Sequence, residues 1–261
     1  MELELKGRTA VVTGGTRGIG RGIADLFHES GASVVINGRS EEKGRRAIEE
    51  MGAGDRVEFI AGDVTSKADV ERLIDGAVDR FGGLDVLVNN AGGIAGWGLV
   101  GDMTDDAWLG TIDMNVNSVF YATRRALKHM IPRSSGRIIN ISSVEGKQAS
   151  KAGVSNYITT KHALHGLTKA VAFEYGPAGI TCNAICPGAV ETDMMMTGGP
   201  EAAKAAGITY EQFLENYANE SMIKRLNTSA EVAAMALLLA SEHGSGITGA
   251  LLNVDGGTAS W

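Results

Sequence analysis

Two residues able to do acid/base chemistry lie four positions apart. Tyr157 and Lys161 open a helical pattern that continues through Leu164, Leu167 and Val171. On a helix, residues four apart share one face and lie about 6 Å from each other. A neighbouring ammonium lowers the pKa of a phenol from its usual ~10, each unit being worth about 1.4 kcal/mol. The pair indicates a tyrosine that transfers protons near neutral pH, with a solvated helix pair as the alternative.

A glycine-rich turn follows the first β-branched run of the chain. The run at 9–12 leads into T-G-G-T-R-G-I-G at 13–20, and a helical pattern begins there. Glycines let the backbone approach a phosphate, and a helix N-terminus directs N–H groups and its dipole at it. The G-x-x-x-G-x-G spacing differs from the general G-x-G-x-x-G fingerprint. Its place between a strand and a helix favours a dinucleotide site over a plain tight turn.

The second β-branched run ends without the acidic residue that NAD-binding folds use to bind the ribose hydroxyls. Its last residues are Asn37, Gly38, Arg39 and Ser40. Arg39, joined by Arg17 from the glycine turn, can make charge-assisted bonds to a 2′-phosphate. This favours NADP(H), with NAD(H) as the alternative, unless Arg39 is an ordinary surface arginine.

The elements that must position these residues form an alternating series. Short β-branched or apolar runs lie at 9–12, 33–36, 57–60, 85–88, 137–141, 180–185 and 251–254, and helical patterns separate them, as at 19–30, 67–81 and 230–241. Such alternation predicts a parallel sheet with crossover helices. No linker or repeat divides the 261 residues. We therefore expect an α/β fold, a single Rossmann-like doubly wound domain over 1–261 with about seven strands and helices on both faces.

One segment breaks this rhythm. Residues 187–228 are too long for an ordinary connection and carry Met194, Met195 and Met196 followed by Tyr210, Phe213, Tyr217 and Met222. Long insertions with flexible side chains often form active-site lids, so we expect a substrate lid over about 189–228. A pair of helices that buries these residues in the core is the alternative.

Charge and cysteine content narrow the partners and the compartment. The net charge is −7, which gives no basic surface for nucleic acid. Cys182 and Cys186 lie in one predicted strand, about 13 Å apart and too far for a disulfide, so we expect reduced, buried thiols. The opening MELELKGR lacks a signal peptide's apolar stretch, and the longest apolar run, 232–240, is too short for a bilayer. We expect a cytoplasmic protein with no membrane association.

The order of motifs along the chain resembles the short-chain dehydrogenase/reductase family. The matches are the glycine loop, Asp63-Val64, Asn89-Asn90-Ala91-Gly92, Asn115, Ser142-Ser143, Tyr157 with Lys161, Pro187-Gly188 and Asp255-Gly256-Gly257. They span nearly the whole chain and are specific as a set. Similar motifs occur in 3-oxoacyl-carrier-protein reductases, polyketide ketoreductases and hydroxybutyrate dehydrogenases.

The resemblance implies a role for each catalytic position. Tyr157 is the general acid in ketone reduction and the base in alcohol oxidation, and Ser143 bonds the substrate oxygen. Lys161 bonds the nicotinamide ribose and tunes Tyr157, and Asn115 holds a water that relays protons to Lys161. The charge that develops on oxygen then meets two donors already in place.

The glycine turn, Arg39 and the resemblance together assign a cofactor site. Its expected residues are Gly14, Thr16, Arg17, Gly18, Ile19, Gly20, Arg39, Asp63, Val64, Asn90, Ala91, Gly92, Tyr157, Lys161, Pro187, Gly188, Val190 and Thr192. The asparagines have a structural alternative, since this residue often bonds loop backbone, and Asn89 is the first candidate for it.

Further features bear on partners. The resemblance implies a homotetramer assembled through 113–130 and 157–175 with the C-terminal strand. Phe173 stands where carrier-protein-dependent relatives have an arginine, so the resemblance does not support a carrier-protein partner. His162 and His165 lack a third ligand at suitable spacing, and no metal is expected. Trp97 lies in a glycine-rich loop, either lining a substrate pocket or packing as core.

These observations predict an NAD(P)(H)-dependent oxidoreductase that interconverts a secondary alcohol and a ketone. The methionine-rich lid indicates a bulky or cyclic carbonyl substrate. A 3-oxoacyl-thioester or polyketide ketoreductase is the alternative. A catalytically silent dinucleotide-binding sensor is a remote one, since such proteins typically lose the tyrosine or the lysine, and this chain has both.

Overall fold

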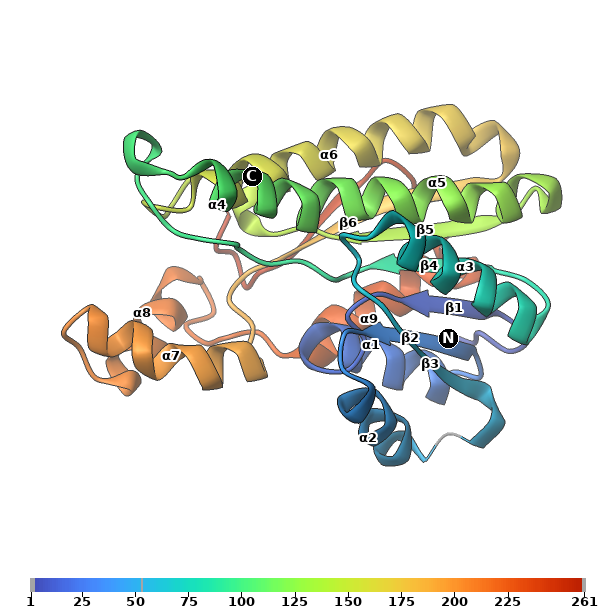
Figure 1. Cartoon of the computed structure of the whole chain (residues 1–261), viewed down its shortest axis with the longest axis horizontal. Coiled ribbons are helices and arrows are strands. Elements are labelled where there is room, and N and C mark those ends of the chain that lie inside the picture. Colours follow the sequence, from blue (N-terminus) through green and yellow to red (C-terminus); the bar gives the residue numbers. More distant parts are fainter. Residues whose placement is uncertain (1–2, 53, 260–261) are drawn as a thin grey trace.

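The computed structural model of the chain describes residues 3–52 and 54–259, and in these residues seven strands alternate with helices (Figure 1). The strands are β1 (Thr9–Val12), β2 (Ser33–Gly38), β3 (Val57–Ala61), β4 (Val86–Asn89), β5 (Gly136–Ile141), β6 (Ile180–Pro187) and β7 (Leu251–Val254). The α-helices are α1 (Gly18–Glu29), α2 (Glu41–Met51), α3 (Lys67–Phe81), α4 (Asp105–Ile112), α5 (Ser118–Met130), α6 (Ser155–Tyr175), α7 (Asp193–Ala205), α8 (Tyr210–Glu220) and α9 (Ser229–Ala240). The strand predictions are confirmed to within two residues at each end.

The strands form one sheet in the order β3-β2-β1-β4-β5-β6-β7, and every neighbouring pair is parallel. The chain builds outward from β1 to β3, returns to the centre at β4, and builds outward on the other side. Ligands of such sheets bind at the carboxyl ends of the strands where this reversal occurs. The doubly wound Rossmann-like fold is therefore confirmed, and its reversal lies between β1 and β4.

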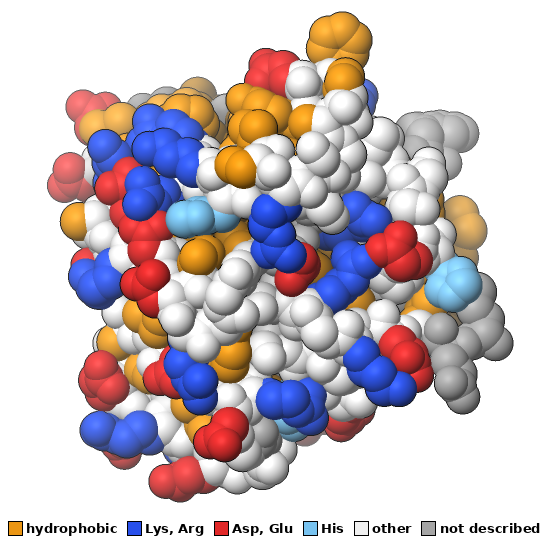
Figure 2. All heavy atoms as spheres, turned by 90° about the vertical axis from the view of Figure 1, so that its right-hand side faces the viewer, with side chains coloured by type: hydrophobic (Ala, Val, Ile, Leu, Met, Phe, Trp, Pro, Cys, Tyr) orange, Lys and Arg blue, Asp and Glu red, His pale blue; other side chains and the backbone are white. Residues whose placement is uncertain are grey.

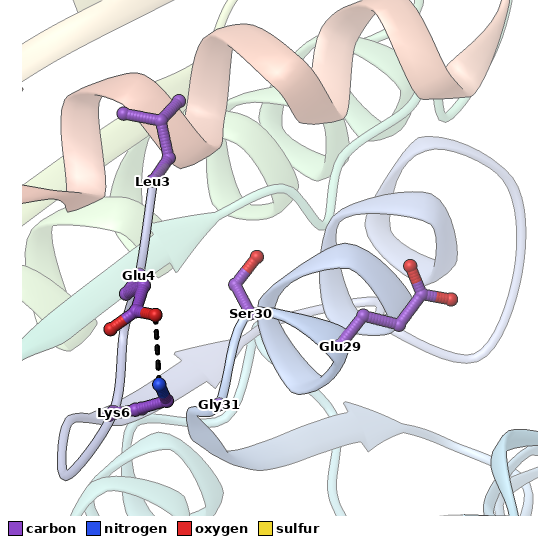
Figure 3. Close-up of a pocket in the computed structure, with 6 residues that line it drawn as sticks. All are labelled: Leu3, Glu4, Lys6, Glu29, Ser30 and Gly31. Carbon is purple, nitrogen blue, oxygen red and sulfur yellow. Dashed lines mark hydrogen bonds and ion pairs between the residues drawn. The ribbon is translucent and has the colours of Figure 1, made fainter. Parts of the chain in front are cut away.

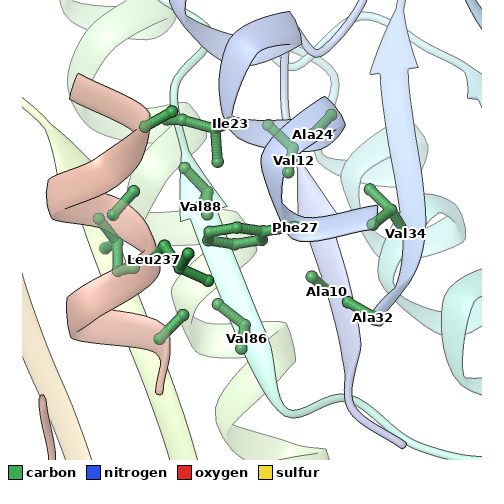
Figure 4. Packing of buried hydrophobic residues seen from close by; sticks show 14 of the residues in the cluster. Ala10, Val12, Ile23, Ala24, Phe27, Ala32, Val34, Val86, Val88 and Leu237 are labelled. Carbon is green, nitrogen blue, oxygen red and sulfur yellow. The ribbon is translucent and has the colours of Figure 1, made fainter. Parts of the chain in front are cut away.

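Helices bury both faces of the sheet. Helices α1, α2 and α9 pack on one face, and α3, α5 and α6 cover the other (Figure 1). On the first face the fully buried Phe27 ring lies among Val86, Val88 and Leu237 (Figure 4). Because interiors are close-packed, the strand ends that emerge from this core are held in fixed positions.

The predicted insertion is a pair of helices, α7 and α8, set beside the carboxyl edge of the sheet (Figure 1). Its base is closed by a parallel bridge between Val190 and Asn227. The Phe213 ring lies 6.3 Å from the Tyr210 centroid and 5.0 Å from the Tyr217 centroid. The alternative prediction, a pair of helices that buries these residues in the core, is correct about the helices. It is wrong about the core, because the aromatic rings pack on each other and are only partly buried.

The strands begin at the opposite edge of the molecule. Positive and negative side chains are interspersed over it (Figure 2). A hollow beside the end of α1 is lined by Leu3, Glu4, Lys6, Glu29, Ser30 and Gly31, and Lys6 pairs with Glu4 at 2.8 Å (Figure 3). Exposed pairs of this kind contribute little energy. No described helix is both long and apolar enough to cross a membrane.

Candidate active site

The residues predicted from sequence gather at the carboxyl edge of the sheet. The glycine turn follows β1, Asn90 follows β4, Ser143 follows β5 and Gly188 follows β6. In a parallel sheet these four loops emerge on the same side. Tyr157 and Lys161 reach this edge from the first turns of α6.

Backbone angles and close neighbours require glycine at particular positions of the turn after β1. Gly14 and Gly18 have φ angles of +63° and +56°, which other residues rarely adopt. A Cβ atom on Gly20 would overlap the Asn90 amide and lie 2.5 Å from the Gly14 carbonyl oxygen. The Asn90 side chain donates to the Thr13 and Gly14 carbonyls at 2.9 and 3.2 Å, so it braces the turn.

The N-terminus of α1 is shaped for an anion. Ser or Thr side chains cap α2, α3, α4, α8 and α9, whereas α1, like α5, α6 and α7, has no side-chain cap. Its first N–H groups and the positive dipole end remain for a phosphate. Within the described residues, neither Arg17 nor Arg39 forms an ion pair. The turn and the uncapped helix fit the pyrophosphate of a nicotinamide dinucleotide.

The remaining predicted cofactor positions surround this turn. Thr192 lies beside Gly18, 3.5 Å from where a Gly18 Cβ would be, so the loop after β6 meets the loop after β1. Gly188 donates its N–H to the Val254 carbonyl at 3.1 Å. Asp63 accepts from the N–H and hydroxyl of Thr65 at 2.9 and 2.8 Å, in a turn that precedes α3. Thr16 lies in the turn, Ile19 in the first turn of α1, Pro187 at the end of β6, and Val64, Ala91 and Val190 in loops that follow strands.

Asn115 lies in a π-helical turn, Asp113–Asn117, between α4 and α5. Single π turns are rare and occur often at functional sites. The Asn115 amide donates to the Gly93 carbonyl and the Thr160 hydroxyl, both at 2.9 Å, and its oxygen accepts from the Gly93 N–H at 2.8 Å. Both N–H groups of the amide are thus used in joining the loop after β4 to α6, and the amide oxygen keeps a second lone pair for a further donor.

The Lys161 side chain is 5% exposed and donates to the Ile141 carbonyl at 2.8 Å. Its Nζ lies 5.4 Å from the Tyr157 ring centroid and 3.7 Å from where a Gly92 Cβ would be. Burial lowers the pKa of the Lys161 ammonium to about 8. The spacing prediction is correct in bringing the two side chains together on one face of the helix.

The predicted direction of the Tyr157 pKa is wrong. Burial raises the pKa of the phenol, and the nearby Glu145 carboxylate raises it further, while a hydrogen bond with Ser143 opposes them. Residue spacing brings the lysine near the phenol but gives no measure of how deeply the phenol is buried. The Ser143 hydroxyl nevertheless lies close enough to the phenol to affect its pKa.

Three buried positioning residues escaped the sequence analysis. Asn156, fully buried, accepts from the Tyr157 N–H at 2.8 Å and donates to the Gly96 carbonyl at 3.0 Å. The Thr13 hydroxyl oxygen accepts hydrogen bonds from the Asn90 and Ala91 N–H groups, both at 3.0 Å. Glu145 is 5% exposed and holds the loop that follows Ser143. Their places beside matched motifs were the only signal, since their partners are distant in sequence.

Behind Lys161 lies a small buried polar cluster. His165 Nε2 lies 2.9 Å from Ser142 Oγ and 3.4 Å from Cys186 Sγ. Burial lowers the pKa of His165 to about 4 and raises those of the Cys182 and Cys186 thiols to about 12 and about 11. Both cysteines are free, as their spacing predicted. Within residues 3–52 and 54–259, no group of three His, Cys, Asp or Glu side chains is placed to hold a metal.

Comparison with known proteins agrees with this architecture. Residues 8–203 match the family model described as short chain dehydrogenase. The chain is 38% identical over 261 residues to 3beta-hydroxysteroid dehydrogenase 2 of Eggerthella lenta, covering 98% of this chain and 96% of that one. It is 38% identical over 255 residues to D-beta-hydroxybutyrate dehydrogenase of Cupriavidus necator, covering 97% and 98%. A crystal structure of an actinorhodin polyketide ketoreductase variant with NADPH superposes with a TM-score of 0.92 at 35% identity, covering 97% and 98%.

The chain therefore belongs to the short-chain dehydrogenase/reductase family. It is an NAD(P)-dependent oxidoreductase that interconverts a secondary alcohol and a ketone.

Proposed function

We propose that Tyr157 is the general acid/base of this reaction, with Ser143, Lys161 and Asn115 as its partners. The observation that carries the proposal is that the buried Tyr157 phenol lies close enough to the Ser143 hydroxyl for it to affect the Tyr157 pKa, beside the buried Lys161 and at the strand edge that also holds the glycine turn. Two hydroxyl donors that face each other define one position where a carbonyl oxygen accepts from both.

The roles follow from the chemistry of these groups. Bound at this edge, the nicotinamide supplies the hydride in reduction and accepts it in oxidation. Ser143 orients the substrate oxygen, and Tyr157 gives it a proton as negative charge develops there. The raised pKa of Tyr157 keeps the phenol protonated at neutral pH, the state that reduction needs. We assign to Lys161 and the Asn115 turn the return of a proton to Tyr157 after each reduction.

We propose a preference for NADP(H) over NAD(H). Arg39 follows β2 and is exposed, Arg17 precedes α1, and no carboxylate occupies the end of β2. A guanidinium pair attracts the 2′-phosphate, and an acidic residue that would repel it is absent from Asn37–Ser40. The similar ketoreductase structure carries NADPH.

The proposed substrate is a bulky or cyclic carbonyl compound. Trp97, Leu99 and Val100 are 74%, 60% and 77% exposed, and Gly98 among them donates to the Gly153 carbonyl at 3.0 Å, four residues before Tyr157. Trp97 is therefore not core, and an apolar rim of this kind favours a large apolar ligand. Relatives named for hydroxysteroids and a polyketide fit this class. A 3-oxoacyl thioester remains the competing substrate class, because a 3-oxoacyl-[acyl-carrier-protein] reductase is also similar, at 36% identity.

Steady-state kinetics test the proposal. Purified protein should oxidise NADPH with multi-ring ketones in a panel that also contains small acyclic ketones and 3-oxoacyl thioesters. NADPH should give the higher kcat/KM with each. No turnover on any ketone would refute the proposed function, and an NADH preference above about tenfold would refute the arginine argument.

We also propose a cytoplasmic homotetramer. Phe120 on α5 and Phe173 on α6 are 42% and 86% exposed, as expected for residues that a second copy covers. Two free cysteines suit the reducing cytoplasm. Light scattering on the purified protein measures the oligomeric state.

A further inference from the structure

The segment between Ser143 and Tyr157 connects the proposed catalytic residues to the lid. It contains a 3-10 turn, Val144–Gly146, followed by the loop 147–154, which leads into α6. Both ends of this segment therefore carry a proposed reacting group. The loop lies on the side of the carboxyl edge that faces α8.

The inner half of this segment is anchored by Glu145. Its N–H donates to Ser143 Oγ at 3.1 Å, which fixes the serine side chain from the loop side. Its carboxylate accepts from the Ser150 N–H at 3.1 Å and also from the Ser150 hydroxyl. A buried carboxylate with two donors from one residue holds that residue tightly. The backbone that carries Lys151 is thus tied to the catalytic serine.

The outer half reaches α8 through Lys151. Its Nζ lies 3.5 Å from the centroid of the Tyr217 ring and 3.5 Å from Glu220 Oε2. Tyr217 packs edge-on against Phe213, so the lysine contacts the aromatic cluster that joins α7 and α8. An ammonium held over a ring face interacts more favourably than an exposed ion pair. The contact crosses from the catalytic loop to the lid.

We propose that Lys151 is a positioning and specificity-determining residue, which holds α8 against the loop before Tyr157 and thereby fixes the roof over substrates large enough to reach it. The part of this inference that concerns substrates rests on the proposed function. We expect a small ketone held at Ser143 and Tyr157 to make no contact with α8. A multi-ring ketone loses a wall when the contact is broken. Lys151 touches no reacting atom, so its loss raises KM and leaves kcat nearly unchanged.

The test compares Lys151→Met with wild type. Methionine keeps most of the stem and removes the charge. Lys67→Met on α3 is the matched control, because Lys67 also pairs with a glutamate on the surface, Glu71 at 3.9 Å. KM and kcat are measured for one multi-ring and one small acyclic ketone, and hydrogen exchange is followed at the α8 amides without substrate. Lys151→Arg and Tyr217→Leu supply the conservative and the reciprocal change.

For Lys151→Met we expect a rise of about tenfold in KM for the multi-ring ketone, less than about twofold for the small one, and about tenfold faster α8 exchange. Tyr217→Leu should reproduce this pattern, whereas Lys151→Arg and Lys67→Met should resemble wild type. Equal effects on both ketones, or unchanged exchange in Lys151→Met, would overturn the inference. If wild type turns over no ketone, the proposed function fails and takes the specificity role with it, while faster α8 exchange in Lys151→Met still supports the contact itself.

Discussion

The proposed site has two parts that are built differently. We call the buried polar residues around Asn115 and Lys161 the floor, and the segment 189–228 the lid. On the floor, Asn115 and Lys161 are 1% and 5% exposed, and their polar atoms bond to carbonyls, N–H groups and hydroxyls of other elements. In the lid, Met196 and Met222 are 50% and 71% exposed, and the half-buried Lys151 reaches α8 from the loop after Ser143. The floor is held by buried polar bonds and the lid by side-chain packing at the surface.

This difference separates chemistry from selectivity. Proton transfer needs groups placed to within a fraction of an ångström, which buried bonds with fixed geometry provide. Substrate selection needs a surface that adapts to ligand shape, which flexible methionine and stacked aromatic side chains provide. Substitutions in the floor should therefore remove activity on every substrate, whereas those at the exposed rim and lid should change preference.

The largest effect is expected for Tyr157→Phe. The ring keeps its packing while the proton donor is lost, so kcat/KM should fall by about a thousandfold on every ketone. NADPH consumption measures the rate, and quenching of protein fluorescence by NADPH serves as the control, since cofactor affinity should be retained. Full activity in this variant would refute the claim that substitutions in the floor remove activity on every substrate.

The next effect is expected for Gly20→Val. Its Cβ has no space beside the Asn90 amide and the Gly14 carbonyl, so the glycine turn must move. NADPH affinity should fall by about a hundredfold, measured by calorimetry. Gly166→Ala is the matched control, because its position on α6 has no neighbouring atom within 4 Å. The control should bind normally and gain up to about 1 kcal/mol of stability.

Arg39→Asp should change cofactor preference without abolishing catalysis. The side chain is exposed and unpaired within the described residues, so its loss leaves the floor intact. Loss of a charge-assisted bond and the new repulsion should lower kcat/KM for NADPH relative to NADH by about tenfold or more. Kinetics with both cofactors provide the ratio, and an unchanged ratio would contradict the assignment of Arg39.

The smallest effect concerns the stability cost of the floor. Burial lowers the pKa of Lys161 to about 8 from the usual 10.5. At pH 7 the folded protein therefore contains a buried ammonium, which lowers the free energy of unfolding. Lys161→Met should lose activity. Its free energy of unfolding at pH 7 should nevertheless be higher by about 1–2 kcal/mol, because removing the desolvation cost outweighs losing the hydrogen bond to the Ile141 carbonyl. The gain should shrink as pH rises from about 8 to 10.5, where the unfolded wild-type chain also loses the proton. Denaturant unfolding at several pH values measures it, and a destabilised variant at pH 7 would refute this account.

Much of the fold was readable from the chain. Residues 67–81 form the predicted helix because Val70, Leu73, Ile74 and Ala77 place one apolar stripe on it, which α3 buries. Strand 180–185 extends to Pro187 because Cys186 and Pro187 continue the pairing with β7. The lid was recognised as an insertion, but its packing was not, because aromatic spacing alone does not say whether rings face the core or each other.

The sequence predicted that Tyr157 and Lys161 lie close together, but it did not predict the electrostatics of the candidate site. Tyr157 and Lys161 share a helix, so their proximity follows from spacing. The rise in the Tyr157 pKa depends on burial and on Glu145, and the bonds of Asn115 join residues 22 and 45 positions away. No local pattern encodes these contacts, since they form only when separate loops meet at one edge.

The sequence alone determined the parallel sheet, the glycine turn, the absence of an acid after the second strand, and the tyrosine and lysine on one helix face. Each of these is set by periodicity, side-chain type or spacing within a short segment. The tertiary structure decided which groups are desolvated and which loops touch: the lowered pKa of Lys161, the π turn at Asn115, and the Glu145–Ser150 and Lys151–Tyr217 contacts. Desolvation and long-range contact depend on how distant segments pack, so they exist only once the chain has folded.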